Sequence, residues 1–369
     1  MNTSIAAIGT ATPANKYTQH EIAEYMVNAL DLDPARARRL HALYRATGIS
    51  TRHSVLADYR AMPANDTFFN QTNGTLTLPG TASRMLRYRK EALGLSLQAV
   101  AQCLGQDLST TPNNITHLIT VSCTGMYAPG LDIELIERLG LSPNTERTCI
   151  NFMGCYAAFP ALKAAHAICK ANPQARVLVL CIEMCSLHFQ NKTDDDNLLA
   201  NAIFADGAAA VIVRNTQPHE PALVMNRFFC GLLPKGKQDM AWAIGNLGFE
   251  MRLSAYVPDI IRTGISSLIN QLLSSHGSDL KAVNHYAIHP GGKKILQAIE
   301  AELGLTRHDN RFAYQVLSQY GNMSSPTVLF VLKALWQAAT PGNNGQQALS
   351  LAFGPGLTLE SALFTITGQ

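Results

Sequence analysis

Cys155 and His289 are two residues whose types and surroundings could together carry out acyl transfer. Cys155 follows Gly154 in "INFMGCYAAFPALKAA", residues 150–165, where a short apolar run leads into a helix of small residues. A thiolate is a strong nucleophile, and a helix N-terminus or a nearby histidine cation lowers the pKa of the thiol that forms it. His289, in "HYAIHPGG", could be that partner, which would give a thiolate–imidazolium pair.

Asn322, in "YGNMSS", adds an amide donor that stays uncharged over a wide pH range. Hydrogen bonds from Asn322 and His289 could stabilise a thioester oxygen while negative charge develops on it. Such stabilisation would serve both an enolate formed by decarboxylation and the tetrahedral intermediates of acyl transfer. Structural roles stay open at this point: Cys155 as core filling, His289 as a strand-end histidine and Asn322 as a turn or cap residue.

The elements that must position these residues alternate along the chain. Short apolar runs predict buried strands, with helical patterns between them, and this alternation predicts an α/β fold. The predicted strands are residues 4–9, 117–123, 175–183, 208–213, 285–289, 348–353 and 361–366.

The order of these pieces recurs in the two halves of the chain. "ITHLITVSCTG" and "VNHYAIHPGG" each precede a helix that ends in "RLGL" or "ELGL", and a glycine-containing turn that enters another helix follows. One of these turns carries Cys155 and the other Asn322. We therefore predict a duplicated unit, with residues 1–214 carrying the cysteine and residues 215–369 carrying the histidine and asparagine. Around a pseudo-two-fold axis the two turns would meet beyond the strand ends, where α/β folds bind ligands.

The composition indicates a large buried core and gives no support to nucleic-acid binding. Hydrophobic residues make up 47% and charged residues 15% of the 369 residues, and the net charge is only +3. The richest basic cluster, residues 35–45, is either a solvated helix face or a site for a phosphorylated ligand such as coenzyme A. No apolar segment is long enough to span a membrane, and the N-terminus lacks a signal-peptide pattern.

The eight cysteines predict neither a metal site nor a disulfide framework. They form no CxxC pair and no compact cluster with histidines. We therefore expect reduced thiols in a cytoplasmic protein without a bound metal.

Four motifs, in this order and spacing, resemble those of the type III polyketide synthases, the chalcone synthase-like family. They are "GCYAAF" with Cys155, "HPGG" with His289, "YGNMSS" with Asn322 and "FGPG" at 353–356. The resemblance covers nearly the whole chain, including "FADGAAAVIV" at 204–213 and "TRH" at 51–53.

The resemblance implies a thiolase-like fold of duplicated αβαβα layers, a homodimer and an iterative condensation. Cys155 would accept an acyl group from an acyl-CoA starter. His289 and Asn322 would promote decarboxylation of malonyl-CoA and hold the thioester oxygen of the resulting enolate. Attack of this carbanion on the Cys155 thioester would lengthen the chain by two carbons. Coenzyme A thioesters are the substrates, and no metal or redox cofactor is implied.

The resemblance also assigns residues to the substrate cavity. Phe189 matches a gatekeeping phenylalanine between the coenzyme A tunnel and the cavity, and Met251 stands where plant enzymes carry a second one. Cys185 and His188 replace small hydroxyl residues of the plant cavity. Further expected cavity residues are Cys123, Thr124, Ser324, Phe353, Gly354 and Pro355. Expected coenzyme A contacts are Arg39, Arg45, Gly291 and Gly292.

Two departures from the plant pattern bear on the substrate. The loop at 122–130 is shorter than the plant loop and resembles that of bacterial enzymes making alkylpyrones and alkylresorcinols, while Ala352 replaces the glycine expected before "FGPG". Met251 is flexible and apolar, so it could open space for an aliphatic chain or simply fill the core. We therefore expect a medium- or long-chain fatty acyl-CoA starter and an alkylpyrone or alkylresorcinol product.

Three alternatives share parts of this pattern. A ketoacyl synthase III would carry out one condensation with an acyl carrier protein, a cysteine thiolase would use similar residue types, and an inactive subunit would only bind ligands. "HPGG" and "FGPG" match the polyketide synthases better than the first two. Retention of Cys155, His289 and Asn322 together argues against an inactive subunit.

Overall fold

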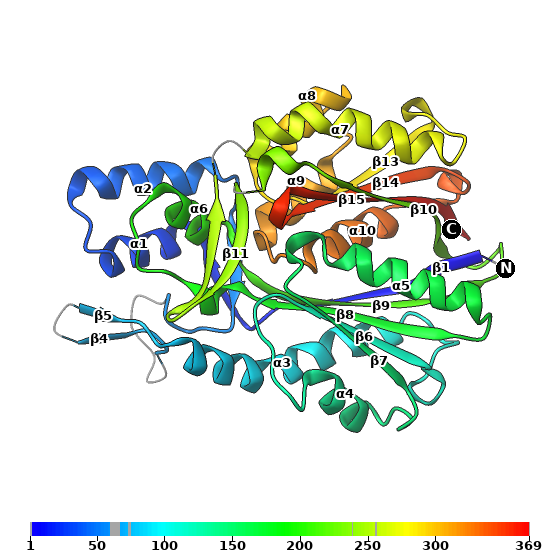
Figure 1. Ribbon diagram of the computed structural model, residues 1–369, viewed down its shortest axis with the longest axis horizontal. Helices are drawn as coiled ribbons and strands as arrows, with labels where there is room; N and C mark the ends of the chain where they lie inside the picture. Colours follow the sequence, from blue (N-terminus) through cyan, green and yellow to red (C-terminus); the bar gives the residue numbers. More distant parts are fainter. Residues whose placement is uncertain (1, 60–66, 73–74, 238, 255–256, 369) are drawn as a thin grey trace.

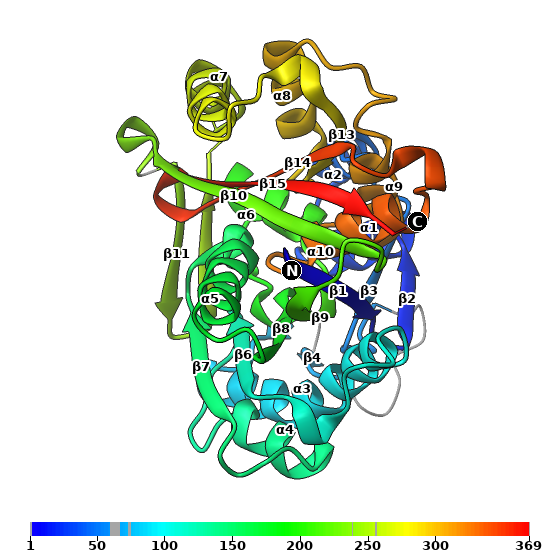
Figure 2. The ribbon, with the colours of Figure 1, turned by 90° about the vertical axis from the view of Figure 1, so that its right-hand side faces the viewer.

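Two layers of β-strands enclose a pair of buried helices, and further helices cover the outer face of each layer (Figures 1 and 2). The computed structural model describes residues 2–59, 67–72, 75–237, 239–254 and 257–368. The buried pair is α5 (Ala158–Ala171) and α10 (Thr327–Gln337). One outer layer contains α3 (Thr81–Leu104) and α4 (Leu131–Leu139), and the other α7 (Val257–Ser274) and α8 (Lys293–Leu303). The layers therefore alternate α, β, α, β, α, as in the thiolase-like fold.

The strands of both layers belong to one mixed sheet, whose order among the described residues is β13-β14-β15-β10-β1-β9-β8-β6-β7. The sheet bends, so that its two ends lie in different layers (Figure 2). Its strands are β1 (Asn2–Ala11), β6 (His117–Ser122), β7 (Glu146–Asn151), β8 (Arg176–Met184), β9 (Asp206–Thr216), β10 (Ala222–Leu232), β13 (Val283–Ile288), β14 (Gln347–Gly354) and β15 (Thr358–Thr367).

Smaller elements surround this framework. Three two-stranded sheets pair β2 (Asn15–Thr18) with β3 (Thr51–Ser54), β4 (Asn70–Thr72) with β5 (Thr75–Thr77), and β11 (Met240–Gly245) with β12 (Gly248–Leu253). The remaining helices are α1 (Gln19–Ala29), α2 (Pro34–Ala46), α6 (Asp195–Ile203) and α9 (Arg311–Tyr320).

The two halves repeat the same strand arrangement, which confirms the predicted duplication. In the first half β6 pairs with β8 in parallel, β8 with β9 antiparallel and β9 with β1 antiparallel. In the second half β13, β14, β15 and β10 pair in the same order and senses. The helices α4 and α8 also correspond, because each ends at a glycine in the left-handed conformation, Gly140 and Gly304. The loop at 217–221 joins the repeats, while a division into domains at 214/215 stays a prediction.

Some elements had no clear sequence signal. β7, with the sequence "ERTCIN", lies at the edge of the sheet and exposes most of its side chains, so it lacks the apolar run of a buried strand. The β11–β12 hairpin carries aromatic residues that line the active-site cavity described below. The sequence did not predict this hairpin either.

The ends of α1 and α2 follow ordinary capping rules. Thr18 and Glu21 form a capping box at the start of α1, in which each side chain accepts a hydrogen bond from the other residue's backbone N–H. Asp33 caps α2 by accepting N–H bonds from its first turn, and Pro34 occupies the first helical position. The two helices pack side by side at one end of the molecule (Figure 1).

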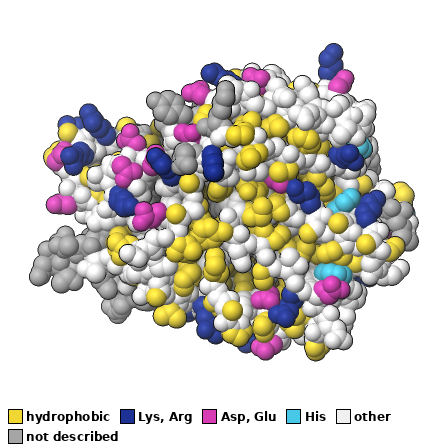
Figure 3. Space-filling view, viewed as in Figure 1, with side chains coloured by type: hydrophobic (Ala, Val, Ile, Leu, Met, Phe, Trp, Pro, Cys, Tyr) yellow, Lys and Arg dark blue, Asp and Glu magenta, His cyan; other side chains and the backbone are white. Residues whose placement is uncertain are grey.

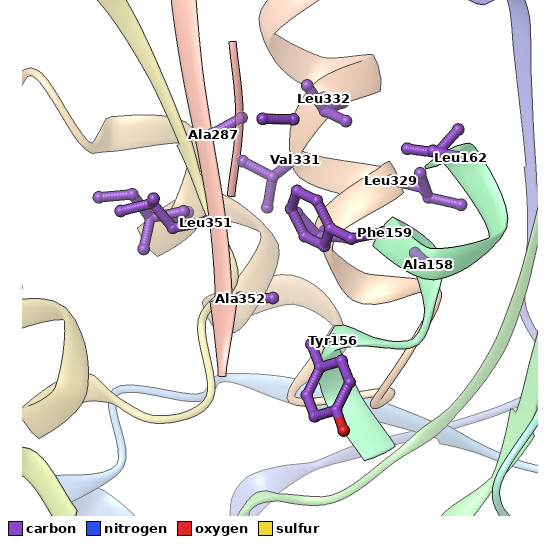
Figure 4. Close-up of a cluster of buried hydrophobic side chains, with 14 of the residues drawn as sticks. Tyr156, Ala158, Phe159, Leu162, Ala287, Leu329, Val331, Leu332, Leu351 and Ala352 are labelled. Atoms are coloured by element: carbon purple, nitrogen blue, oxygen red, sulfur yellow. The ribbon is translucent and has the colours of Figure 1, made fainter. Parts of the chain in front are cut away.

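A continuous apolar core joins the two halves around α5 and α10 (Figure 4). Phe159 of α5 is fully buried and points toward the α10 residues Leu329 and Val331. The alanines of α5 are small enough to let this helix pack closely against strands of both layers. Removing a buried phenylalanine of this kind typically costs about 3–5 kcal/mol of stability. The central helices are therefore held firmly, and the turns that lead into them inherit that rigidity.

Within the described residues, no helix is both long enough and apolar enough to cross a membrane.

Candidate active site

A cavity at the junction of the two halves contains the predicted chemical residues. Its empty space is about 1050 Å³, part of which opens to solvent. Most of the predicted site residues line it: Cys123, Thr124, Cys155, Cys185, His188, Phe189, Met251, His289, Gly291, Asn322, Ser324, Phe353 and Pro355. The lining comes from both repeats, so the cavity exists only when the halves are packed together.

A tight turn positions Cys155 at the base of α5. Gly154 has φ 80°, and a Cβ atom there would lie 2.2 Å from the Pro355 Cδ atom. Only glycine fits this position, because a side chain would be strained and would also collide with the "FGPG" turn of the other half. Cys155 follows in a short 3-10 helix, Gly154–Tyr156, that leads directly into α5. The sulfur therefore lies near the positive end of the α5 dipole, as the sequence predicted.

Asn322 faces Cys155 from the corresponding turn of the second half. The Cys155 Sγ atom lies 3.9 Å from Nδ2 and 4.0 Å from Oδ1 of Asn322. The Ser324 backbone N–H donates to Oδ1 at 2.8 Å, and Nδ2 donates to the Gly291 carbonyl at 3.4 Å. These two bonds fix the orientation of the amide, with its N–H₂ group on the side of the Gly291 carbonyl and both of its polar atoms about equally far from the sulfur.

Backbone pairing across the halves holds the Asn322 turn in place. The Asn322 N–H donates to the Ile203 carbonyl at 2.9 Å, and its carbonyl accepts from Ala205 N–H at 2.8 Å. Gly321, with φ 70°, makes the bend that this pairing requires. The amide is consequently anchored to the first half although it belongs to the second.

His289 follows the end of β13 and is almost completely buried. Among the residues that the structure describes, neither Nδ1 nor Nε2 has a hydrogen-bond partner. A buried polar group without a partner costs about 1–3 kcal/mol, so such groups are rare unless a ligand or reaction uses them. The imidazole lies beside Gly291, where a side chain would come within 3.6 Å of the ring.

Burial opposes an isolated charge on either reactive group. It raises the pKa of the Cys155 thiol to about 11, and nearby Glu183 acts in the same direction while hydrogen bonds from Ser324 and Asn322 oppose it. Burial also lowers the pKa of His289 to about 3. Moving the thiol proton onto the imidazole would charge both groups at once without a net charge. The predicted thiolate–imidazolium pair therefore requires the two groups to act together.

Part of the cavity wall is made of packed aromatic rings, which the sequence did not predict. Phe249 stacks on His188 with ring centroids 4.2 Å apart, and Trp242 lies edge-on to both rings. The Trp242 Nε1–H donates to the Cys123 carbonyl at 2.8 Å. Met251 pairs with Trp242 across the β11–β12 hairpin. The available signal was the alternation of "AWAIGNLGFEM", but nothing in it indicated contact with the cysteine loop.

His188 is locked in one tautomer by two backbone groups. Its Nδ1 accepts from Phe249 N–H at 2.9 Å, so Nε2 carries the hydrogen that it donates to the Thr124 carbonyl at 2.6 Å. Burial lowers the pKa of His188 to about 3. His188 therefore shapes the cavity wall as a neutral ring.

Glu183 carries a buried carboxyl group near Cys155. The sequence did not predict this position either. It accepts hydrogen bonds from Cys123 N–H and from the Thr124 and Ser325 hydroxyls at 2.6–2.9 Å. Burial raises its pKa to about 7. A lone acidic residue inside the apolar strand "LCIEMC" was the available sequence signal. Its bonds tie the loop at 122–124 to the Asn322 turn.

Phe189, the predicted gatekeeper, is held firmly at the cavity wall. Its ring packs edge-on against Phe69 with centroids 5.2 Å apart, and Arg84 Nη1 donates to its carbonyl at 2.9 Å. This anchoring suits a residue that narrows a passage.

Four predicted residues do not line the cavity. Gly354 packs against the Tyr156 ring, where a Cβ atom would lie 2.5 Å away, and Gly292 precedes α8 in open space. Arg39 and Arg45 are exposed on α2, because Leu40 and Tyr44 form the buried face of that helix. Basic and acidic side chains are mixed over this end of the molecule (Figure 3). The coenzyme A contacts of Arg39, Arg45 and Gly292 stay predictions.

A thiol, an amide and a free imidazole that meet inside a duplicated thiolase-like fold define an acyl-transferring condensing enzyme. The models of the chalcone and stilbene synthases match nearly all of the chain, the N-terminal domain at residues 2–217 and the C-terminal domain at residues 226–367. The chain belongs to the chalcone and stilbene synthase family, and it is a type III polyketide synthase, an acyltransferase.

Relatives and solved structures agree with this assignment. The α-pyrone synthesis polyketide synthase-like Pks18 of Mycobacterium tuberculosis strain CDC 1551 is 30% identical, over 98% of this chain and 91% of that protein. Probable polyketide synthase 1 of Dictyostelium discoideum is 32% identical over 97% of this chain, which spans only 11% of that protein. The crystal structure of PKS-I from the brown alga Ectocarpus siliculosus superposes with a TM-score of 0.91 at 27% identity, covering 99% of this chain and 98% of the other.

Proposed function

We propose that this type III polyketide synthase extends an acyl-CoA starter, held as a thioester on Cys155, by repeated decarboxylative condensation with malonyl-CoA. The observation that carries the proposal is the convergence of three groups in one cavity: the Cys155 sulfur, the Asn322 amide about 4 Å from it, and the unpartnered His289 imidazole.

The first step is acyl transfer to the cysteine. The Cys155 sulfur attacks the starter's thioester carbonyl while His289 takes the thiol proton as a general base. The tetrahedral intermediate collapses, the C–S bond to coenzyme A breaks, and the departing thiolate takes the proton from the imidazolium. The N-terminus of α5 supports negative charge on the Cys155 sulfur during the attack.

The second step forms the carbon nucleophile. Malonyl-CoA loses CO₂, and the bonding electrons move into an enolate whose oxygen accepts hydrogen bonds from Asn322 and from neutral His289. The enolate carbon then attacks the Cys155 thioester and releases the thiolate, leaving the chain longer by two carbons on coenzyme A. Burial favours the uncharged imidazole in this step, because it lowers the pKa of His289.

Separate variants test these roles. We expect Asn322→Ala to keep acylation of Cys155 by a starter but to lose malonyl-CoA decarboxylation by about 100- to 1000-fold. His289→Ala should impair both steps, since one imidazole serves as base and as donor. Retention of normal decarboxylation in Asn322→Ala would contradict the assigned role of the amide.

The starter is proposed to be a medium- or long-chain fatty acyl-CoA, and the product an alkylpyrone or alkylresorcinol. Support comes from the apolar lining, with Met251, Trp242 and Phe249 in the cavity wall, and from the likeness to a relative named for α-pyrone synthesis. The proposed reaction needs no metal or redox cofactor.

A competition assay tests the starter. Purified enzyme would receive labelled malonyl-CoA with equal amounts of a fatty acyl-CoA and benzoyl-CoA, and products would be resolved by mass spectrometry. We expect extended fatty chains to dominate. Preference for the aromatic starter would overturn this part of the proposal without affecting the condensation chemistry. A single β-keto extension would instead favour the ketoacyl synthase alternative.

The enzyme is further proposed to act as a homodimer in the cytoplasm. The edge strand β7 supports the dimer, because among the described residues only one side of it is paired and most of its side chains are exposed. Unprotected edges of this kind readily pair with another chain. A dimer through β7 would cover Cys149, which is exposed in the single chain.

A further inference from the structure

Three side chains on α1 and α2, outside the active-site cavity, form a compact group of metal-ligand type. We propose that His20, Glu24 and His41 bind a divalent transition-metal ion of the zinc class. Cysteine spacings in the sequence predict no metal site, and His41 is separated in the chain from His20 and Glu24. The histidine and carboxylate donors become neighbours only when α1 and α2 pack together.

The geometry is close to that of a zinc site. His20 and Glu24 are four residues apart on α1 and therefore lie on one face of that helix. Glu24 Oε1 lies 3.8 Å from His20 Nδ1 and 3.3 Å from His41 Nε2, and all three donor atoms lie within 4.8 Å of one another. Tetrahedral zinc with bonds of about 2.0–2.1 Å needs ligand atoms about 3.4 Å apart. The Glu24–His41 pair already has that spacing, and the remaining donor pairs would have to close by at most about 1.4 Å.

The donor set also selects the class of ion. Two imidazoles and one carboxylate suit zinc, nickel or copper, whereas magnesium and calcium prefer sites made only of oxygen atoms. Three protein ligands leave the fourth position of a tetrahedral ion to water. The side chains of His20, Glu24 and His41 are 76%, 52% and 22% exposed, so an ion can reach them from solvent.

A bound ion would cross-link α2 to α1, and α1 reaches the active-site wall. Besides the ligands, α1 carries Met26, which lines the cavity, and Gln19, whose amide donates to the Ala202 carbonyl at 2.7 Å. An ion held between α1 and α2 would therefore stabilise this end of the fold. It would not take part in the condensation, because the ligands lie outside the cavity lining.

Glu24 could instead form ion pairs with protonated His20 and His41. Added zinc separates the two interpretations, because a metal site gains stability when zinc binds to the folded protein, whereas a group of ion pairs gains none.

The test is zinc binding to the full chain after chelator treatment and buffer exchange, followed by calorimetry and thermal unfolding at pH 7.5. We expect one site of micromolar or tighter affinity and a higher melting temperature with zinc, but no rise with magnesium. His20→Asn and His41→Asn should each weaken binding about tenfold or more and reduce the thermal shift accordingly. His276→Asn, which alters an exposed histidine elsewhere, should leave both readouts unchanged.

Two results would overturn the proposal. One is unchanged zinc affinity in His20→Asn and His41→Asn, which would indicate binding elsewhere, such as at the exposed thiol of Cys230. The other is the absence of zinc binding to a wild-type chain that shows a normal unfolding transition. Polyketide synthesis is independent of either result.

Discussion

On the proposed mechanism, the reactivity of Cys155 depends on transfer of its proton to His289. While His289 is uncharged, burial raises the pKa of Cys155 to about 11. Almost no thiolate would then form at neutral pH. An imidazolium in the same cavity would lower that pKa strongly, because opposite charges attract more in a medium of low dielectric constant. The thiolate is therefore expected to exist only as half of an ion pair.

Alkylation kinetics test this coupling. We predict that iodoacetamide modifies Cys155 of the wild type readily at pH 6.5 and that His289→Asn slows the reaction at this pH by about tenfold or more. In the variant the reaction should accelerate continuously toward alkaline pH, since only the high pKa imposed by burial remains. Peptide mapping would identify the modified residue. Identical pH profiles for the two proteins would refute the ion pair.

His188 makes a separate contribution to the pH dependence of stability. Its folded pKa of about 3 lies below the usual value of 6.5, so the unfolded state binds the proton first as the pH falls. Stability from this group is complete above pH 6.5 and is lost toward pH 3, by about 1.4 kcal/mol per pH unit. Glu183 and Asp206, with raised pKa values, act in the opposite direction.

Comparison of the wild type with His188→Asn isolates this effect, because Glu183 and Asp206 contribute equally to the pH dependence of stability in both proteins. Asparagine Oδ1 can replace Nδ1 as the acceptor for Phe249 N–H, and the lost bond to the Thr124 carbonyl costs the same at both pH values. Urea unfolding at pH 7.5 and 5.0 should show the stability advantage of the wild type shrinking by about 2 kcal/mol at the lower pH. A pH-independent difference would mean that His188 is not held neutral.

Among single residues, motif and spacing predicted Cys155, His289 and Asn322, because each occurs in a distinctive turn. Trp242, Phe249 and Glu183 could not be predicted in the same way. Their positions in the cavity arise from contacts between segments far apart in the chain, such as the bond from Trp242 to the Cys123 carbonyl. An apolar or aromatic residue in a strand gives no sign of which cavity it faces.

At the scale of elements, close packing of α3 on β1 tests the layered arrangement. Gly9 of β1 lies against this helix so closely that a Cβ atom would be 2.1 Å from the Ala99 carbonyl and 2.3 Å from Cys103 N. Gly94, on the exposed side of α3, has no atom within 4 Å of such a Cβ. The same substitution is therefore expected to have opposite effects at the two glycines.

We predict that Gly9→Ala destabilises the protein by about 3 kcal/mol, because helix and strand backbones must separate. Gly94→Ala should stabilise it by roughly 0.5–1 kcal/mol through better helix propensity. Urea unfolding at one pH measures both. Equal effects of the two changes would show that α3 does not pack on β1 as described.

The element order was predictable because strands and helices repeat with recognisable ends, such as the "RLGL" and "ELGL" termini of α4 and α8. β7 and β10 were not predicted, since an exposed edge strand and a half-exposed strand need no continuous apolar pattern. The grouping of His20 and His41 was also hidden, because it depends on how α1 packs against α2. Local sequence pattern therefore predicted most strands and helices of each repeat. The exposed strands and the contacts between helices depend on packing between elements and could not be predicted from it.

At the scale of the whole molecule, the proposed dimer predicts a solution mass and a protection pattern. Light scattering should give twice the chain mass of 40.0 kDa. Cys149 of β7 should react with a maleimide more slowly than Cys230, although both are exposed in the single chain and the pKa of Cys230 is raised by partial burial. A monomeric mass with rapid labelling of Cys149 would contradict a dimer through β7.

The cavity forms only when the two repeats pack together, and the reaction inside it can be measured directly. Purified enzyme with a fatty acyl-CoA and malonyl-CoA would be analysed by mass spectrometry for products and for the intact protein, beside Cys155→Ala. We predict an acyl adduct on Cys155 and products extended by more than one malonyl unit, both absent from the variant. Extended products that persist in Cys155→Ala would contradict the role of Cys155 as the acyl-carrying nucleophile.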